Sequence, residues 1–214
     1  MSPRVLGVIP ARGGSKRVPG KNLRMLCGKP LIQYTIDAVQ AATKLTTFVV
    51  STEDQAIGRL AANLGCYVVR RPDDLADDEV TSGAVCKHAL EWMEAESEPY
   101  DIIVCLHPTS PIRDPKHIDE AIDLLAAAKN FECLASMYRI PPKPHANVFS
   151  FDWRALHGAY VLNASIYAMK RDWLIRTGEH VSSDSMPLFM DRRHSIDINE
   201  EIDLKVAELY LNGD

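Results

Sequence analysis

The segment whose residue types could do chemistry lies near the start of the chain, at residues 10–22, with the sequence PARGGSKRVPGKN. Its glycines let backbone N–H groups approach a ligand closely, and its cations can offset compact negative charge. These cations are Arg12, Lys16, Arg17 and Lys21. The spacing matches neither the G-x-x-x-x-G-K-[ST] P-loop nor the G-x-G-x-x-G dinucleotide fingerprint. We predict a polyphosphate site of another type; the plainer alternative is a solvated basic loop.

Charge is unevenly distributed along the chain. The first 36 residues carry seven cations and no acid, and because the formal net charge is −5, the rest of the chain carries −12. An acidic average argues against a general nucleic-acid binder, which needs surplus Lys and Arg to replace phosphate counterions. The cationic start therefore indicates a local anion site.

The elements that must position this segment follow from hydrophobic periodicity, in which short apolar runs alternate with stretches of helical period. The expected strands are 5–9, 47–51, 66–69, 100–106, 133–138 and 162–169. The expected helices are 31–42, 54–64, 81–95, 115–129 and 200–211. This alternation predicts one α/β domain over 1–214, with a Rossmann-like, mostly parallel sheet and helices on both faces. Ligands of such sheets bind beyond the carboxyl ends of the strands.

Two elements carry more specific expectations. The run 100–106 is apolar without alternation, which is typical of a central strand covered on both faces. In the last helix, the inward residues are expected to be Ile202, Val206, Leu209 and Tyr210.

The segment 139–161 breaks the alternation of strands and helices. It begins with a Pro-rich turn, after which Phe149, Phe151 and Trp153 alternate as in an extended arm. Aromatic side chains without a neighbouring strand often pack against a second subunit, so we predict a dimerization arm and hence a homodimer; a lid or surface flap is the alternative.

Five cysteines occur without a CxxC motif or a Cys/His cluster, so we expect buried, reduced thiols. The start of the chain has too short an apolar run for a signal peptide, and no later run approaches the length of a membrane span. These features predict a cytoplasmic protein that does not contact membranes.

Several sequence blocks together carry a family resemblance. They are ARGGSK at 11–16, PGKNL at 19–23, GKPL at 28–31, VSTED at 50–54, RRP at 70–72, LADD at 75–78, PTSPIR at 108–113, NASIY at 163–167 and SIDIN at 195–199. In this order the blocks resemble the acylneuraminate cytidylyltransferases, the CMP-sialic acid synthetases, nearly from end to end.

The resemblance implies that CTP and a nine-carbon 2-keto sugar acid give a CMP-sugar and pyrophosphate, in cell-surface polysaccharide biosynthesis, with Mg²⁺ as cofactor. The anomeric hydroxyl attacks the α-phosphorus in line, so the protein must hold the triphosphate and neutralise the leaving group. The resemblance implies that Arg12 and Lys21 are catalytic residues that bind the triphosphate. Further substrate contacts in the loop are expected from Ala11, Gly13, Gly14, Ser15 and Lys16. For Arg17 an ordinary surface charge stays an equal alternative.

Other substrate contacts implied by the resemblance are Asn22, Ser82, His107, Thr109, Ser110 and Asn163. Asn22 could instead cap a helix or turn, Ser82 could be an N-cap, and the hydroxyls at 109 and 110 could only form a turn. The family more often has Gln where this chain has His107. We interpret His107 as a hydrogen-bonding group rather than a base, although its imidazole could titrate near neutrality.

The segment 195–199 is the predicted metal site. If it is extended, Asp197 and Asn199 point the same way, and carboxylate or amide oxygens suit Mg²⁺ beside phosphates. The family commonly has a second Asp at position 199, so Asp197 is predicted as a metal ligand with catalytic function, and Asn199 as a weaker ligand. The acids Glu200, Glu201 and Asp203 are assigned to helix-dipole stabilisation.

The sugar is less well specified. Family members that use N-acetylneuraminate typically carry Arg-Pro where this chain has Val161-Leu162. Either Arg139, Lys143, Arg192 or Arg193 binds the sugar carboxylate, or the sugar is a legionaminic or pseudaminic acid. Two further alternatives are a cytidylyltransferase for Kdo and an inactive nucleotide-binding module, to which Asn199 is the one pointer.

Overall fold

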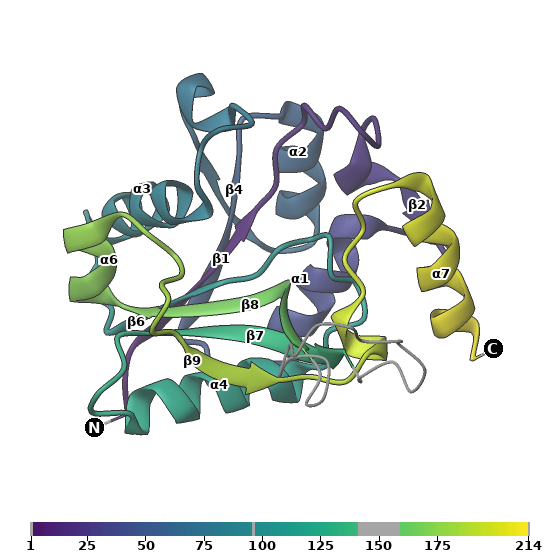
Figure 1. The fold of residues 1–214 in the computed structure, drawn as a ribbon. Coiled ribbons are helices and arrows are strands. Elements are labelled where there is room, and N and C mark those ends of the chain that lie inside the picture. Colours follow the sequence, from purple (N-terminus) through teal and green to yellow (C-terminus); the bar gives the residue numbers. More distant parts are fainter. Residues whose placement is uncertain (1, 96, 141–158, 214) are drawn as a thin grey trace.

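The computed structural model describes residues 2–95, 97–140 and 159–213 (Figure 1). Within them the chain forms a seven-stranded sheet in which β6 is central. In spatial order the strands are β5 (Tyr67–Arg70), β4 (Thr47–Thr52), β1 (Val5–Pro10), β6 (Ile102–Cys105), β8 (Ala159–Lys170), β7 (Cys133–Ile140) and β9 (Met186–Phe189). Of these, β8 runs antiparallel to both of its neighbours and the other pairs are parallel. The predictions of a mostly parallel sheet and of a central strand at 100–106 are confirmed.

Helices cover both faces of this sheet. They are α1 (Leu31–Ala41), α2 (Gln55–Asn63), α3 (Ser82–Glu94), α4 (Pro115–Ala127), α6 (Arg171–Thr177) and α7 (Glu201–Asn212). Short elements complete the described fold: the 3-10 turns η1 (Lys21–Leu23), η2 (Asp73–Ala76) and η3 (Arg193–Ser195), and the hairpin of β2 (Met25–Leu26) with β3 (Lys29–Pro30).

Strand β1 shows how the sheet separates two cores. Val5 and Ile9 pack in the core that contains the apolar residues of α1, α2 and α4, whereas Leu6 and Val8 pack in the core that contains those of α3 and α6. Successive side chains of a strand point to opposite faces, so an uninterrupted apolar run serves both cores. The two-sided arrangement predicted from the sequence is therefore observed.

Helix α7 corrects the expected burial. Ile202 and Leu209 are exposed, at 57% and 54%, whereas Leu204 and Ala207 are buried. The reason is the partner of the helix: α7 packs in a small core beside β2 rather than against the sheet (Figure 1). Both stripes have helical spacing, so periodicity alone could not choose between them.

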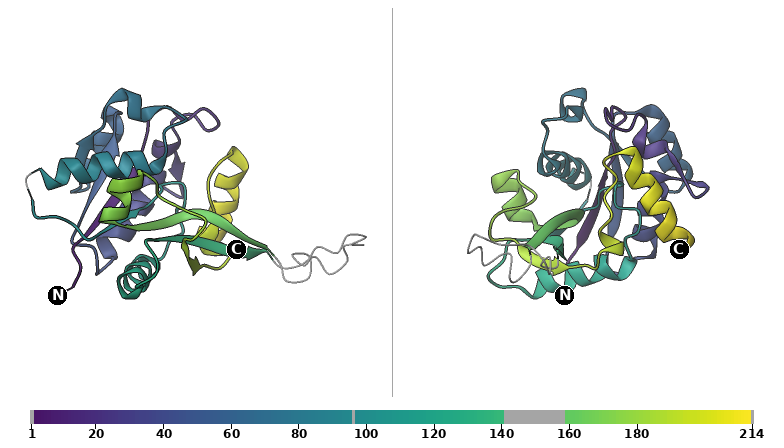
Figure 2. Two further views of the ribbon diagram at one scale, coloured as in Figure 1. Left: turned by 60° about the vertical axis from the view of Figure 1, so that its left-hand side comes forward. Right: turned by 45° about the vertical axis from the view of Figure 1, so that its right-hand side comes forward.

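The ends of the predicted excursion 139–161 belong to the sheet. Arg139 pairs with Tyr160, and Ile140 pairs with Ala159, as the last pairs of the β7–β8 ladder. This ladder projects beyond the body of the molecule (Figure 2). The central part of the excursion, 141–158, with its aromatic residues, lies outside the described residues.

The described chain contains no helix that is both long and apolar enough to cross a membrane. All five cysteines are free thiols. Four of them are buried as expected, but Cys27 is exposed on the turn between β2 and β3.

Candidate active site

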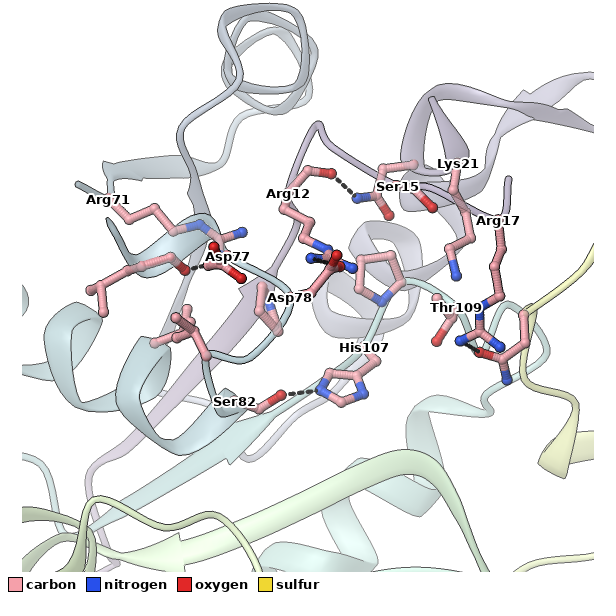
Figure 3. A pocket seen from close by; sticks show the side chains of 17 residues that line it. Arg12, Ser15, Arg17, Lys21, Arg71, Asp77, Asp78, Ser82, His107 and Thr109 are labelled. Atoms are coloured by element: carbon pink, nitrogen blue, oxygen red, sulfur yellow. Dashed lines mark hydrogen bonds and ion pairs between the residues drawn. The ribbon is translucent and has the colours of Figure 1, made fainter. Parts of the chain in front are cut away.

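A cavity of about 280 Å³ opens at the carboxyl ends of the parallel strands (Figure 3). Its walls come from the loop after β1, the segment from β5 to the start of α3, the loop after β6, and the segment before α7. The residues that line it include Arg12, Arg17, Lys21, Asn22, Arg71, Asp78, Ser82, His107, Thr109 and Asn199. The glycine-rich loop thus lies where the topology of the sheet predicts a ligand site.

The glycine-rich loop is held by short contacts to its neighbours. The N–H of Gly13 donates to Glu53 Oε1 at 2.7 Å, and a Cβ at position 13 would lie 2.5 Å from Asp54 Oδ2. Any side chain at position 13 would therefore displace the acids that follow β4. Asn22 is buried and donates from Nδ2 to the carbonyl of Arg12 at 2.8 Å. It holds the loop from within and also lines the cavity, so it is no simple helix cap.

Lys21 and Arg17 both reach the segment that precedes α7. Lys21 Nζ donates to the carbonyl of Ile198 at 2.8 Å, and Arg17 Nη2 donates to Asn199 Oδ1 at 3.1 Å. Burial lowers the pKa of Lys21, and the charge of Asp197 opposes this shift. Arg17 is therefore part of the cavity wall rather than only a surface charge.

Arg12 and Lys16 share one acidic partner, because both ion-pair with Asp78. Ser15 lines the cavity, as its position in the loop implies. In the described structure the positive charge at this end of the cavity is thus offset by a carboxylate from the loop before α3.

Arg71 is a cavity residue that the sequence reasoning missed. It is 4% exposed; its Nε lies 3.1 Å from Glu53 Oε2, and its Nη1 donates to the carbonyl of Leu75 at 3.3 Å. Nη2 is buried and has no hydrogen-bond partner in the described structure. Burial lowers the pKa of Arg71, and the charge of Glu53 opposes this. The RRP block directly after a predicted strand was the available signal, since that position lies at the ligand edge.

Ser82 and His107 meet at the floor of the cavity, with Ser82 Oγ 2.8 Å from His107 Nε2 (Figure 3). The N-cap of α3 is Thr81, whose Oγ1 accepts from the N–H of Ala84. Ser82 is thus the first helical residue, and the alternative of an N-cap role for it is wrong.

Arg113 holds the backbone of His107 in place. This buried side chain donates to the carbonyl of His107 at 2.8 Å, to both oxygens of Ser165 and to Thr35 Oγ1. The loop after β6 is tied again at Thr109, whose carbonyl accepts from the N–H of Ile198 at 2.7 Å. The floor of the cavity is therefore rigidly connected to β8 and to the segment before α7.

Several predicted contacts do not line the cavity. Ala11 is fully buried in the core below the loop, and Ser110 is also buried. Gly13 and Gly14 lie in the loop without forming the cavity wall. Asn163 does not line this cavity either: it is 3% exposed, its Oδ1 accepts from Ser136 Oγ at 2.5 Å, and its Nδ2 donates to Ser195 Oγ at 2.9 Å. The Asn163 side chain joins β8 to β7 and η3 instead of facing the cavity.

Asp197 and Asn199 are adjacent but not equivalent. Asn199 Nδ2 donates to Asp197 Oδ2 at 2.7 Å, while Asn199 Oδ1 faces Arg17. Asp197 Oδ1 is buried without a hydrogen-bond partner among the described residues. In that same part of the chain, no group of three or more His, Cys, Asp or Glu could hold a metal ion by itself. Among the described residues, a cation here would have one free carboxylate oxygen, Asp197 Oδ1, as its protein ligand. Its other ligands would have to come from a bound molecule.

The acids at the start of α7 have the structural function expected for them. Glu200 and Asp203 form a reciprocal capping box, and Asp203 Oδ2 also accepts from the N–H of Asn199 at 2.8 Å. Glu201 ion-pairs with Arg24. These contacts hold the segment 197–199 against the cavity.

Comparison with known proteins identifies the family of this chain. The family model described as cytidylyltransferase matches residues 6–205. An N-acylneuraminate cytidylyltransferase of Escherichia coli O18:K1:H7 is 30% identical over 97% of this chain, which spans 52% of that protein. A CMP-N,N'-diacetyllegionaminic acid synthase of Legionella pneumophila is 32% identical over 96% of this chain and 95% of its own length.

A solved structure of CMP:2-keto-3-deoxy-manno-octonic acid synthetase complexed with CTP shares the fold, with a TM-score of 0.76, 16% identity and 98% of each chain covered. The predicted fold class is thereby confirmed. On the family model and the two relatives, this chain belongs to the cytidylyltransferase family.

Proposed function

We propose that this protein transfers CMP from CTP to a sialic-acid-like nonulosonic acid, such as N-acetylneuraminate, a legionaminate or a pseudaminate. The anomeric oxygen forms a bond to the α-phosphorus. The bond between the α-phosphorus and the oxygen that bridges it to the β-phosphorus breaks, so pyrophosphate leaves and the hydroxyl proton is released. The observation that carries the proposal is the cavity at the strand ends, where Arg12, Lys21 and Arg71 converge in a cytidylyltransferase fold.

The triphosphate fits the cationic end of this cavity. Lys21 and Arg12 come from opposite ends of the glycine-rich loop, so together they can grip successive phosphates. Donors held in place before the reaction stabilise charge that develops on a leaving group without reorganising. Partial burial of Lys21 strengthens its electrostatic interaction with pyrophosphate, because less water screens it.

The nucleoside fits the end formed by Arg71, Asn22 and Ser82. A buried guanidinium nitrogen without a partner is costly, and a carbonyl oxygen of a pyrimidine would satisfy it. The ion pair with Glu53 holds the Arg71 guanidinium in one orientation. We therefore assign cytosine recognition to this end of the cavity.

Mg²⁺ is proposed as the cofactor, with Asp197 as its protein ligand. The unpartnered Asp197 Oδ1 fits a hard cation, and Mg²⁺ is commonly bound by one or two carboxylates together with substrate phosphates. Asn199 does not fit as a second ligand while its Oδ1 accepts from Arg17 and its amide N–H faces Asp197. The bound cation supplies positive charge that the triphosphate requires.

The sugar carboxylate needs a cation outside positions 161 and 162, which are Val and Leu. Among the predicted partners, Arg193 donates to the carbonyl of Tyr210 at 2.7 Å and is already engaged, whereas Arg192 is exposed. Arg139 is engaged in an interaction of its own, and Lys143 lies outside the described residues. Since these residues single out no one sugar, the proposed substrate is the nonulosonic class as a whole.

A homodimer is proposed through the projecting end of the sheet. Five large apolar side chains of the described residues are exposed there: Ile140, Tyr160, Val161, Leu162 and Phe189. The rings of Tyr160 and Phe189 lie 5.0 Å apart and form one surface. Neighbouring exposed apolar residues of this size indicate a protein interface. A cytoplasmic location is proposed because the free thiols suit a reducing compartment.

Pyrophosphate release from CTP and Mg²⁺ tests the function directly. The sugar panel is N-acetylneuraminate, N,N'-diacetyllegionaminate, a pseudaminate and Kdo, with a reaction lacking sugar as the control. Release with one of the nine-carbon acids is expected. Release with Kdo alone would assign the chain to the other branch of keto sugar acids, and tight CTP binding without release for any sugar would favour a binding module.

A further inference from the structure

Asp78 is an anion built into the cationic end of the active site. It lies in the loop between η2 and α3, beside Arg12 (Figure 3). Its carboxylate ion-pairs with both Arg12 and Lys16. Hydrogen bonds from Lys16 and then Arg12 lower the pKa of Asp78, and Asp78 in turn raises the pKa of Lys16. The carboxylate is therefore ionised at neutral pH in the free protein.

The proposed function assigns Arg12 to the triphosphate, and Lys16 is a second cation of the same glycine-rich loop. A carboxylate and a phosphate present the same kind of charged oxygen, and they compete for the same donor groups. We propose that Asp78 is an internal competitor of the triphosphate, which neutralises Arg12 and Lys16 in the free enzyme and leaves them when CTP binds. This inference rests on the proposed function.

The segment 71–82, which carries Asp78, allows such a displacement. Its two ends are fixed, one by the ion pair of Arg71 with Glu53 and the other by the hydrogen bond of Ser82 with His107. Between them, residues 77–79 are exposed. CTP binding is therefore coupled to movement of residues 77–79, and Asp78 lowers the affinity for CTP below the value that the same cations would give without it.

The test is calorimetric titration of the full chain with CTP and Mg²⁺ in the absence of sugar. Two exposed ion pairs are broken on binding, so Asp78→Asn should bind CTP roughly two- to tenfold more tightly than the wild type. The matched control is Glu79→Gln, which removes the same charge from the next residue. Glu79 is exposed and forms no ion pair within the described residues. Its affinity for CTP should be unchanged.

A double-mutant comparison sharpens the assignment. In the wild type, Lys16 must first leave Asp78, so Lys16→Ala loses a phosphate contact but also removes that cost. In the Asp78→Asn background the cost is already absent, and Lys16→Ala should weaken CTP binding by a larger factor. Equal factors in the two backgrounds would show that Asp78 and Lys16 do not compete for the ligand.

Three results would overturn the inference. Unchanged or weaker CTP binding of Asp78→Asn would make Asp78 a bystander or a ligand contact. Equal tightening in Glu79→Gln would reduce the effect to overall charge. A wild-type chain that binds no CTP would remove the proposed function as well, and that outcome is distinguishable because it appears before any variant is compared.

Discussion

The two ends of the sheet differ in kind. The β5–β4–β1–β6 end is parallel and carries a concave, charged site at the carboxyl ends of its strands. The β8–β7–β9 end contains the antiparallel strand and projects from the body with exposed aromatic and aliphatic side chains (Figure 2). The first end can bind an anion with residues of a single chain, whereas the second presents a surface whose burial needs another molecule.

This difference suggests a division of labour. The nucleotide end is built from short loops, each anchored to its strand by hydrogen bonds, so its geometry is set by the fold of one chain. The other end carries the segment 162–169, whose buried Asn163 ties the strands together, while its outer face is apolar. If chemistry and assembly are separated in this way, a substitution at one end should leave the property of the other end unchanged.

The largest expected effect is on the charged end. Lys21→Ala should lower turnover by about 100- to 1000-fold, because a preorganised donor to the leaving group is lost. The fold should remain, since Lys21 is only half-buried. Steady-state pyrophosphate release with saturating CTP measures the loss, and circular dichroism checks the fold. Arg24→Gln is the matched control: Arg24 is exposed, pairs with Glu201, and should leave turnover near normal. Near-normal turnover of Lys21→Ala would contradict the assignment.

The charged end was also the more predictable one. Arg12 and Lys21 lie in a contiguous motif that follows a strand, so local sequence and topology were sufficient to place both on the cavity. Arg71 was missed because its importance depends on the unpartnered Nη2, which only the packing around Glu53 creates. The ion pairs of Asp78 join segments more than sixty residues apart, and no local pattern indicates them.

Burial was predictable only where a single stripe existed. In α4 the residues Ile118, Ile122 and Leu125 form one stripe of helical spacing, and all three are buried. In α7 two stripes have helical spacing, and the choice depended on tertiary contact with β2. Asn163 shows the limit of a family match: the motif located the residue, but its hydrogen bonds to Ser136 and Ser195 give it a structural position.

The second effect is on stability and concerns Arg113, which joins the loop after β6 to β8. Arg113→Met should lower the free energy of unfolding by about 2–3 kcal/mol, because its buried acceptors on Ser165 and His107 lose charged hydrogen bonds. Urea unfolding measures this change. Arg59→Met, at an exposed position on α2, is the control and should be nearly neutral. Equal stability of the two variants would show that the ends are not joined through Arg113.

A third, smaller effect concerns the apolar end. Tyr160→Ser combined with Phe189→Ser should weaken dimerization at least about tenfold, because exposed aromatic residues at the centre of an interface carry much of its energy. Light scattering over a concentration series measures it. Tyr67→Ser removes an aromatic residue that is equally exposed on β5, at the other edge of the sheet, and should leave assembly unchanged. A wild-type monomer at micromolar concentration would remove the dimer proposal.

The smallest effect concerns a contact between α4 and η3, close to the segment that precedes α7. His117 on α4 and His194 on η3 lie with ring centroids 4.9 Å apart. Burial and then the charge of His194 lower the pKa of His117, against the acids Asp114, Glu120 and Asp191. The folded state therefore binds fewer protons than the unfolded state just below the ordinary pKa of 6.5, and stability should fall as pH drops through this window.

His117→Gln removes this proton uptake and should flatten the dependence, with a difference in Tm from the wild type of at most about 2 °C at pH 5. At pH 8 the imidazole of His117 is neutral in both folded and unfolded chains. The Tm difference between the wild type and His117→Gln at this pH therefore gives the effect of the substitution alone. The difference between the two pH values isolates the titration. If the Tm gap between the proteins is the same at both, the contact between α4 and η3 does not sense pH. The segment leading to Asp197 would then be held independently of the charge on its neighbours.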